Sequence, residues 1–345
     1  MKLTFCLEQT LGHRAHTHNI ERAIAGVDAC VDVVRVDYRE RGRLPLPWTI
    51  RASLDARKAM RARPRPDVAF FHTQTVGLFA SQAARGARFV VSLDATPHQM
   101  DAVGEWYRHR RGPATVEAAK DALYRRMFRG AAAVVAWSDW TADSLVRDYR
   151  VAPGKIHVVH PGAAPELFAI CRPPSPNPVP RILLVGGDFE RKGGDLLLRA
   201  FERLGGRAQL TIVSSAAIRP APNVEVIADA TPGCARLLDA YARADIFCLP
   251  TRADCTSVAV EEAMAAGLAV ITTTVGSNPT TLSHDDSGVL VAPGDEEALF
   301  SALAGLVEDG ATRLRLGAAA RAIARDRYDA RENARRLVKL MESVA

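Results

Sequence analysis

The chain has 345 residues, too many for one ordinary compact domain and suited to two domains of about 150 residues each. Its 48% hydrophobic content excludes a disordered protein, and no apolar run approaches the roughly 20 residues of a membrane-spanning helix. The net charge of +6, from 45 basic and 39 acidic residues, is mild for this length, and we expect no nucleic acid partner.

The first residues and the cysteines indicate where the protein resides. The apolar run at the start breaks at Glu8 and has no cleavage pattern of a signal peptide, so it is interpreted as a first strand. Six cysteines are scattered singly without a CxxC pair, which favours reduced thiols over a structural zinc site. We therefore expect a cytoplasmic protein, either free or at the inner face of the membrane.

The first half alternates short β-rich runs with amphipathic stretches. Helices are predicted at 16–25 and 114–129, and a third begins at the N-cap residue Ser138 and runs toward Arg147. Strands are predicted at 3–7, 31–36, 68–71, 89–93, 134–136 and 156–159. This alternation favours a parallel sheet with helices on both faces.

A proline-rich run at 172–180 marks the expected domain boundary, because each proline fixes φ and removes a backbone donor. After it, helices are predicted at 194–204, 235–242, 257–266, 296–307, 312–325 and 330–343. Strands are predicted at 181–185, 210–213, 224–227, 246–249 and 269–273. The expected organisation is a domain at 1–168, a linker at 169–180, a second domain at 181–328, and a helix at 329–345 that packs back toward the first domain.

Both halves have the same period, so the fold class is α/β: two doubly wound, Rossmann-like domains facing a central cleft. In such sheets, ligands bind beyond the carboxyl ends of the strands, near the points where the strand order reverses. The loops that follow the strands are therefore the places to look for chemistry.

The first such loop is VGGDFERKGG at 185–194, which leads from a strand into a helix. Glycines permit close approach of the backbone to a ligand, and Arg191 with Lys192 can neutralise a diphosphate. The alternative is an ordinary turn with solvated charges.

The second loop follows the strand at 246–249 and opens a helix near Thr256 or Ser257. Asp254 lies in the loop and Glu262 eight residues on, and two such carboxylates can accept hydrogen bonds from hydroxyls of one elongated polar ligand. Taken singly, Asp254 could be a turn residue, and the pair Glu261-Glu262 could be a helix surface. The first loop supplies cations for a diphosphate, and the second supplies hydrogen-bond acceptors for sugar hydroxyls. Together they meet the requirements of a nucleotide-sugar.

Six segments in order now resemble a known family: AWSDWT (136–141), KIHVVHPG (155–162), ERKGG (190–194), ADIFCLP (244–250), EAMAAG (262–267) and SGVLVAPG (287–294). The chain resembles the retaining glycosyltransferases of family four, which have the GT-B fold. The resemblance is strong over 133–309 and holds only in outline before that.

The resemblance implies roles for individual donor-site residues. Asp254 falls on an acid near the hydroxyls of the donor sugar, although the family usually has Glu there, and Glu262 falls on the acid that binds ribose. Lys192 is the family's phosphate-binding Lys, and Arg191 substitutes for an Arg that is missing because Gly187 occupies its place. The amides and hydroxyls of four loop residues are expected to meet phosphate: Cys255, Thr256, Ser257 and Val258.

The resemblance also implies a catalytic group in the first domain. Asp94 stands where family members often have a His, and a carboxylate there could stabilise positive charge on the transferred sugar. The alternative is that Asp94 caps a turn before Pro97, and His98 and His72 are weaker candidates. Gly12 is expected to let the loop approach the donor phosphate. The catalytic residues are thus expected to be Asp94, Asp254 and Lys192.

The expected reaction is retaining transfer of a sugar from a UDP- or GDP-sugar to an unknown glycan, lipid or small-molecule hydroxyl. No cofactor and no metal ion are expected, because the three His at 13, 16 and 18 lack a partnering carboxylate cluster. The basic stretch 108–111 could contact anionic lipid or simply form a solvated face. The rival functions are a sugar-nucleotide epimerase and a catalytically idle nucleotide-sugar-binding protein.

Overall fold

The computed structural model describes the chain except residues 11–12, 26–29, 38–46, 85, 108 and 173–176. The described chain divides into two compact units. The first comprises Met1–Pro161 with Arg331–Ala345, and the second comprises Gly162–Ala330.

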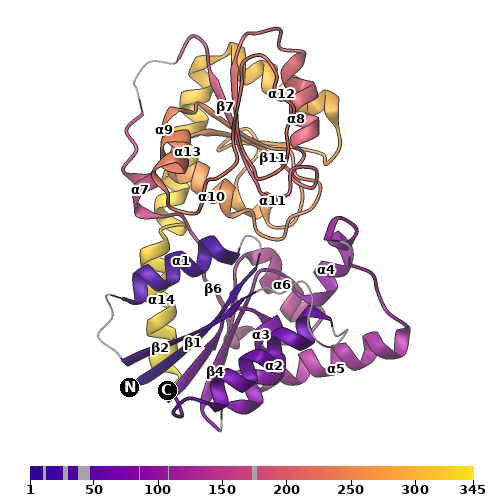
Figure 1. Cartoon of the computed structure of the whole chain (residues 1–345), viewed down its shortest axis with the longest axis vertical. Helices are drawn as coiled ribbons and strands as arrows, with labels where there is room; N and C mark the ends of the chain where they lie inside the picture. The colour runs from indigo at the N-terminus through magenta and orange to yellow at the C-terminus, as the bar shows by residue number, and fades with distance from the viewer. Residues whose placement is uncertain (11–12, 26–29, 38–46, 85, 108, 173–176) are drawn as a thin grey trace. The chain divides into compact units, whose positions relative to one another are not determined.

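The first unit holds a six-stranded parallel sheet in the order β2-β1-β3-β4-β5-β6 (Figure 1). Its strands are β1 (Lys2–Gln9), β2 (Cys30–Asp37), β3 (Val68–Phe71), β4 (Arg88–Leu93), β5 (Ala133–Ala136) and β6 (Ile156–Val158). Its helices are α1 (His13–Ile24), α2 (Trp48–Arg61), α3 (Gln74–Ala80), α4 (Pro97–Val103), α5 (Ala114–Gly130), α6 (Asp139–Arg147) and α14 (Ala330–Ser343). The predicted strands are all present, whereas α2, α3 and α4 were not predicted.

Hydrophobic cores lie on both faces of this sheet, because successive side chains of a strand point to opposite faces. On β1, Cys6 belongs to the core that α2, α3, α5 and α6 cover, whereas Phe5 and Leu7 belong to the core that α1 and α14 cover. From α14, Leu337, Val338 and Met341 enter this second core. The C-terminal helix is therefore part of the first unit.

The second unit holds a six-stranded parallel sheet in the order β12-β11-β10-β7-β8-β9. Its strands are β7 (Arg181–Val185), β8 (Gln209–Val213), β9 (Val224–Ile227), β10 (Ile246–Leu249), β11 (Ala269–Thr273) and β12 (Val289–Val291). Its helices are α7 (Pro165–Phe168), α8 (Gly194–Glu202), α9 (Ala235–Arg243), α10 (Val258–Ala265), α11 (Asn278–Thr281), α12 (Glu296–Glu308) and α13 (Gly310–Arg327).

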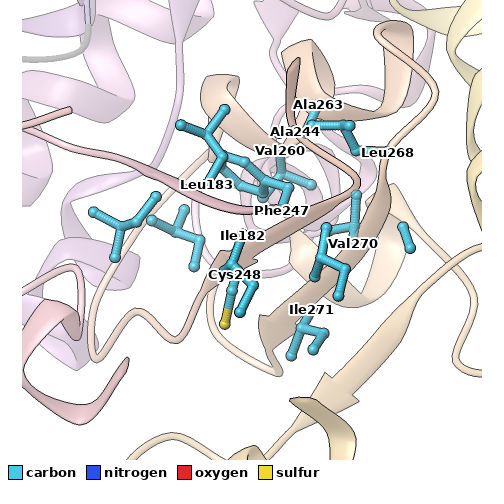
Figure 2. Close-up of a cluster of buried hydrophobic side chains, with 14 of the residues drawn as sticks. Ile182, Leu183, Ala244, Phe247, Cys248, Val260, Ala263, Leu268, Val270 and Ile271 are labelled. Carbon is cyan, nitrogen blue, oxygen red and sulfur yellow. The ribbon is translucent and has the colours of Figure 1, made fainter. Parts of the chain in front are cut away.

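The core of the second unit is built on its central strands. Figure 2 shows Ile182 and Leu183 of β7 and Phe247 of β10 among the buried side chains of this core. Val260 and Ala263 reach the same core from α10 and are fully buried, which fixes that helix against the sheet.

Part of the predicted linker is anchored to the second unit. Ile170 packs against its core. The guanidinium of Arg172 donates to four backbone carbonyls, those of Tyr241, Ala242, Ala244 and Ala266. Residues 173–176 of the predicted linker lie outside the described residues.

Each sheet has one point where the strand order reverses. In the first unit it lies between β1 and β3, and in the second between β7 and β10. The strands on the two sides of such a point send their following loops in opposite directions, which leaves room for a ligand beyond the carboxyl ends. The loops after β1, β3, β7 and β10 are therefore the favoured binding positions.

Candidate functional site

The loops after β7 and β10 meet because of a glycine. Gly193 has φ +74°, and a Cβ added there would lie 2.0 Å from the carbonyl oxygen of Pro250. Only glycine tolerates both the left-handed backbone and this close approach. The sequence ERKGG thereby places Arg191 and Lys192 next to the loop that carries Asp254.

Lys192 and Asp254 form an ion pair across the reversal point. Lys192 Nζ contacts Asp254 Oδ2, and the Ser257 hydroxyl donates to the same oxygen at 2.7 Å. Both side chains are largely buried, with 13% of Lys192 and 9% of Asp254 exposed. Two groups that the sequence assigned to one site thus lie in direct contact.

Arg191 is held by fixed protein groups. Its Nε lies 3.1 Å from Asp188 Oδ2, its Nη1 donates to the carbonyl of Ala253 at 2.8 Å, and Nη1 is 3.8 Å from Asp254 Oδ1. The residue is only 6% exposed. Its guanidinium therefore joins the two loops, and its positive charge reaches the site from behind Asp254.

The predicted phosphate-binding residues form the turn before α10. Cys255 and Ser257 are buried, Thr256 is half-buried, and Val258 is the first residue of the helix. The Thr256 Oγ1 has no hydrogen-bond partner within the described part of the chain. The hydrogen-bonding capacity of this buried hydroxyl is therefore unused within the described residues.

The loop after β11 closes on the same turn. Gly276 has φ +59°, and a Cβ there would lie 2.1 Å from the carbonyl oxygen of Asp254. The Ser277 amide donates to the Cys255 carbonyl at 2.9 Å. Gly187, in contrast, faces open space, since a Cβ there would meet nothing within 4 Å.

The two glutamates of α10 differ in their surroundings. Glu262 accepts a hydrogen bond from the Tyr241 hydroxyl at 2.7 Å, and burial raises its pKa to about 7 against the lowering effect of that bond. Glu261 is 1% exposed and accepts the Gly162 amide at 2.8 Å, and burial raises its pKa to about 8. The alternative that the pair is a helix surface is therefore wrong for Glu261, because α10 packs inside the unit.

In the first unit, Asp94 follows β4, and its Oδ2 lies 3.3 Å from His13 Nε2. Asp94 does not cap the helix that starts at Pro97, since that cap is Thr96, whose hydroxyl accepts from the Gln99 amide. His98 instead lies 3.0 Å from Asp121. Gly12 lies outside the described residues.

Sequence reasoning missed the polar cluster around Asp94. His13 was considered only as part of a histidine-rich stretch, and Glu8 only as the end of an apolar run. The sequence signal that could have revealed this cluster is the spacing of His13 and His16, which lie one turn apart on α1 and therefore share a helix face. Within the described ranges, no group of three or more His, Cys, Asp or Glu side chains is placed to hold a metal ion.

No helix in the described part of the chain combines the length and apolarity needed to cross a bilayer.

Two family models match the chain over consecutive stretches. The model "Glycosyltransferase Family 4" matches residues 9–167, and "Glycosyl transferases group 1" matches residues 179–309.

The chain is also similar to several curated enzymes. It is 32% identical over 244 residues to the D-inositol 3-phosphate glycosyltransferase of Xylanimonas cellulosilytica, covering 62% of this chain and 55% of that protein. It is 24% identical to the MMP alpha-(1->4)-mannosyltransferase of Mycolicibacterium hassiacum, over 89% of this chain and 84% of that protein. The chain thus spans about half the length of the first relatives it matches.

Solved structures share the fold over the whole chain. Sucrose-phosphate synthase from Thermosynechococcus elongatus superposes with a TM-score of 0.79 at 17% identity, covering 100% of this chain and 99% of that one. The Anabaena protein HepE in complex with UDP-glucose gives a TM-score of 0.70 at 16% identity, covering 99% and 100%. The prediction of two α/β domains with doubly wound parallel sheets is confirmed, and the chain belongs to glycosyltransferase family four, the group 1 glycosyltransferases, with the GT-B fold.

Proposed function

We propose that the protein transfers a sugar from a nucleoside-diphosphate donor, UDP- or GDP-linked, to a hydroxyl of an acceptor, and that its second unit binds the donor. The observation that carries this proposal is the Lys192–Asp254 pair at the point where the strand order of the second sheet reverses. This is the position at which doubly wound sheets bind ligands.

The Lys192–Asp254 pair suits a sugar diphosphate because each side chain can leave the other and bind a different part of the donor. A diphosphate is a stronger partner for Lys192 than one carboxylate, since it offers several charged acceptor oxygens. Asp254 is then released to accept hydrogen bonds from hydroxyls of the donor sugar. Arg191 remains behind Asp254, 3.8 Å from Oδ1, and holds that carboxylate in place.

The remaining donor contacts follow from the resemblance and from the free groups of the site. Glu262 binds the ribose hydroxyls, and the amides and hydroxyls of 255–258 meet the phosphates beside Gly187. The open hydrogen-bonding capacity of Thr256 Oγ1 supports this assignment.

The chemistry we propose is retaining and independent of metal. As the bond between sugar and diphosphate breaks, Lys192 and the loop amides stabilise the leaving phosphate, and preorganised charge of this kind is usually the largest contribution such a site makes. The acceptor hydroxyl attacks on the face that the diphosphate leaves, and its proton passes to the departing phosphate oxygen. Asp94, from the first unit, stabilises positive charge on the sugar.

The ligands and names of proteins similar to this chain support these proposed substrates. The Anabaena HepE structures hold UDP, or UDP-glucose, and the curated relatives are named for transfer to D-inositol 3-phosphate and for mannosyl transfer. A polyol or sugar phosphate is therefore the acceptor class to test first.

The direct test is a thermal-shift screen of UDP- and GDP-sugars, followed by incubation of the stabilising donor with and without acceptors. We expect one nucleotide series to raise the melting temperature and product to form only with an acceptor. Conversion of the donor alone to an isomer would instead identify an epimerase. Donor binding with no turnover in any acceptor pool would identify a binding protein.

A further inference from the structure

The first unit carries a polar cluster at the point where its strand order reverses. Glu8 lies near the end of β1, Thr10 follows that strand, His13 begins α1, and Asp94 follows β4. Glu8 is 3% exposed and Thr10 is 7% exposed, whereas the side chains of His13 and Asp94 keep 19% and 21% exposure. A chain of contacts thus runs from a buried acid to a partly open one.

The buried end of the cluster is a carboxylate that only accepts hydrogen bonds. Trp48 Nε1 donates to Glu8 Oε1 at 2.8 Å, the Thr10 hydroxyl donates to the same oxygen at 3.0 Å, and the Thr73 hydroxyl donates to Oε2. Because the single hydroxyl proton of Thr10 points at Glu8, Thr10 must accept from its other neighbour.

That neighbour is His13, whose Nδ1 lies 3.2 Å from Thr10 Oγ1. Nδ1 therefore carries a proton, and a neutral ring of this tautomer has a bare Nε2. Nε2 faces Asp94 Oδ2 at 3.3 Å, and a bare nitrogen opposite a carboxylate oxygen would be repulsive. The geometry consequently places one proton between His13 and Asp94.

The other groups that face His13 do not take up this proton, so the positive charge stays on the His13 ring. Its ring lies against Trp137, with centroids 5.3 Å apart, and near His72, which follows β3; the charge of His13 also acts on His16 of α1. Burial lowers the pKa of His16 to about 3 and that of His72 well below its usual value, so both are neutral. For His13, burial opposes charging, but Asp94 and then Glu8 raise its pKa above the ordinary value.

We propose that His13 is a positioning residue that holds a proton on the His13–Asp94 pair, fixes Asp94 Oδ2, and leaves Oδ1 to accept a hydrogen bond from a hydroxyl of the sugar or polyol substrate. Asp94 Oδ1 has no hydrogen-bond partner among the residues that the structure describes. Thr10 and Glu8 set the orientation of His13 and keep a proton on its Nδ1. The inference rests on the proposed function for the identity of the substrate.

The proton itself is tested without any substrate. Histidine titrations followed by NMR should show His13 changing charge above the usual value in the native protein and at lower pH in Asp94→Asn. At a pH where His13 is neutral, the nitrogen shifts should show its remaining proton on Nδ1, and Thr10→Val should release that preference. An unchanged His13 titration in Asp94→Asn would overturn the proposal.

The functional readout is the pH profile of transfer. In the native enzyme kcat should fall as pH rises through the raised pKa of His13, because the pair then loses its proton. His13→Gln keeps a donor toward Asp94 without the titration, so we expect kcat roughly 10- to 100-fold lower and no fall in that pH range. His18→Gln, on the exposed side of the same helix, is the matched control and should leave both unchanged.

Calorimetry with UDP and GDP separates the two proposals. His13→Gln should bind nucleotide as the native protein does, because that site belongs to the second unit. If the native protein binds neither nucleotide, the proposed function is refuted, while the NMR titration still decides the role of His13. A native kcat and pH profile in His13→Gln would overturn this inference alone.

Discussion

Replacing Glu261 by Gln should stabilise the second unit in a strongly pH-dependent way. The carboxyl is 1% exposed, lies beside Glu262 on α10, and accepts the Gly162 amide at 2.8 Å. Burial, the main cause, raises its pKa from 4.5 to about 8, with the charge of Glu262 adding to the rise and the Gly162 bond opposing it. Gln has nearly the same shape and keeps an acceptor for Gly162.

The sign follows from the raised pKa. Above about pH 4.5 the unfolded chain releases the Glu261 proton, whereas the folded protein keeps it until about pH 8. The contribution of Glu261 to the free energy of unfolding is therefore fully present below pH 4.5 and is lost as pH rises through about 8. A tenfold change in proton affinity corresponds to about 1.36 kcal/mol. Because the Gln amide leaves buried N–H donors that need partners, we expect a net gain for Glu261→Gln of about 2 kcal/mol near pH 8.

Thermal unfolding of the native protein and of Glu261→Gln, at about pH 5 and about pH 8, measures this effect. The variant should melt several degrees higher at the alkaline pH, since about 1 kcal/mol shifts the melting temperature of such a domain by roughly 2–4 °C. The difference should shrink toward pH 5. Glu202→Gln, at an exposed position of α8, should show no such dependence. A difference that is equal at both pH values, or larger in acid, would refute the assignment of a buried, protonated Glu261.

Three further variants test how the loops of the second unit work. Gly187→Arg should fold normally, because the position faces open space. It should tighten UDP or GDP binding roughly tenfold by adding one charged hydrogen bond, whereas Gly187→Ala should leave the affinity unchanged. An unchanged Kd for Gly187→Arg in calorimetry would argue against phosphate near this residue. Gly193→Ala should unfold the donor loops, because its Cβ would meet the Pro250 carbonyl at 2.0 Å, and a native melting curve would contradict the close packing of the two loops. Tyr241→Phe removes the hydrogen bond that lowers the pKa of Glu262, so nucleotide affinity should weaken near neutral pH and recover as pH rises; a pH-independent loss would contradict the role of the Glu262 charge.

The regular elements of the fold could be predicted from the sequence because buried parallel strands leave a strong apolar signal. The runs at 68–71, 134–136 and 246–249 are strands whose residues are all buried. The elements that were missed have weaker signals: α3 and α4 have seven residues each, α7 and α11 four each and strand β12 three, and α2 begins after Pro47 without a side-chain cap.

The donor site could be predicted as a set of residues but not as an arrangement. Motif order identified Lys192, Asp254 and Glu262, whereas their pairing depends on β7 lying next to β10, and strand order is not visible in local patterns. The sequence assigned both Arg191 and Lys192 to phosphate, whereas in the structure Arg191 donates to the Ala253 carbonyl and Lys192 pairs with Asp254. The His13–Asp94 contact joins residues 81 positions apart, beyond the reach of any local rule.

The measurement that most directly tests the central claim is calorimetric titration of UDP and GDP into the native protein, Lys192→Met and Arg203→Met. Arg203 pairs with Glu297 on the surface of the same unit and serves as the control for a lost positive charge. The native protein and the control should bind one of the two nucleotides with similar Kd. Lys192→Met should bind it roughly 10- to 100-fold more weakly, since a hydrogen bond to a charged group is worth about 1.5–3 kcal/mol. Equal binding by Lys192→Met, or no binding of either nucleotide by the native protein, would contradict the account.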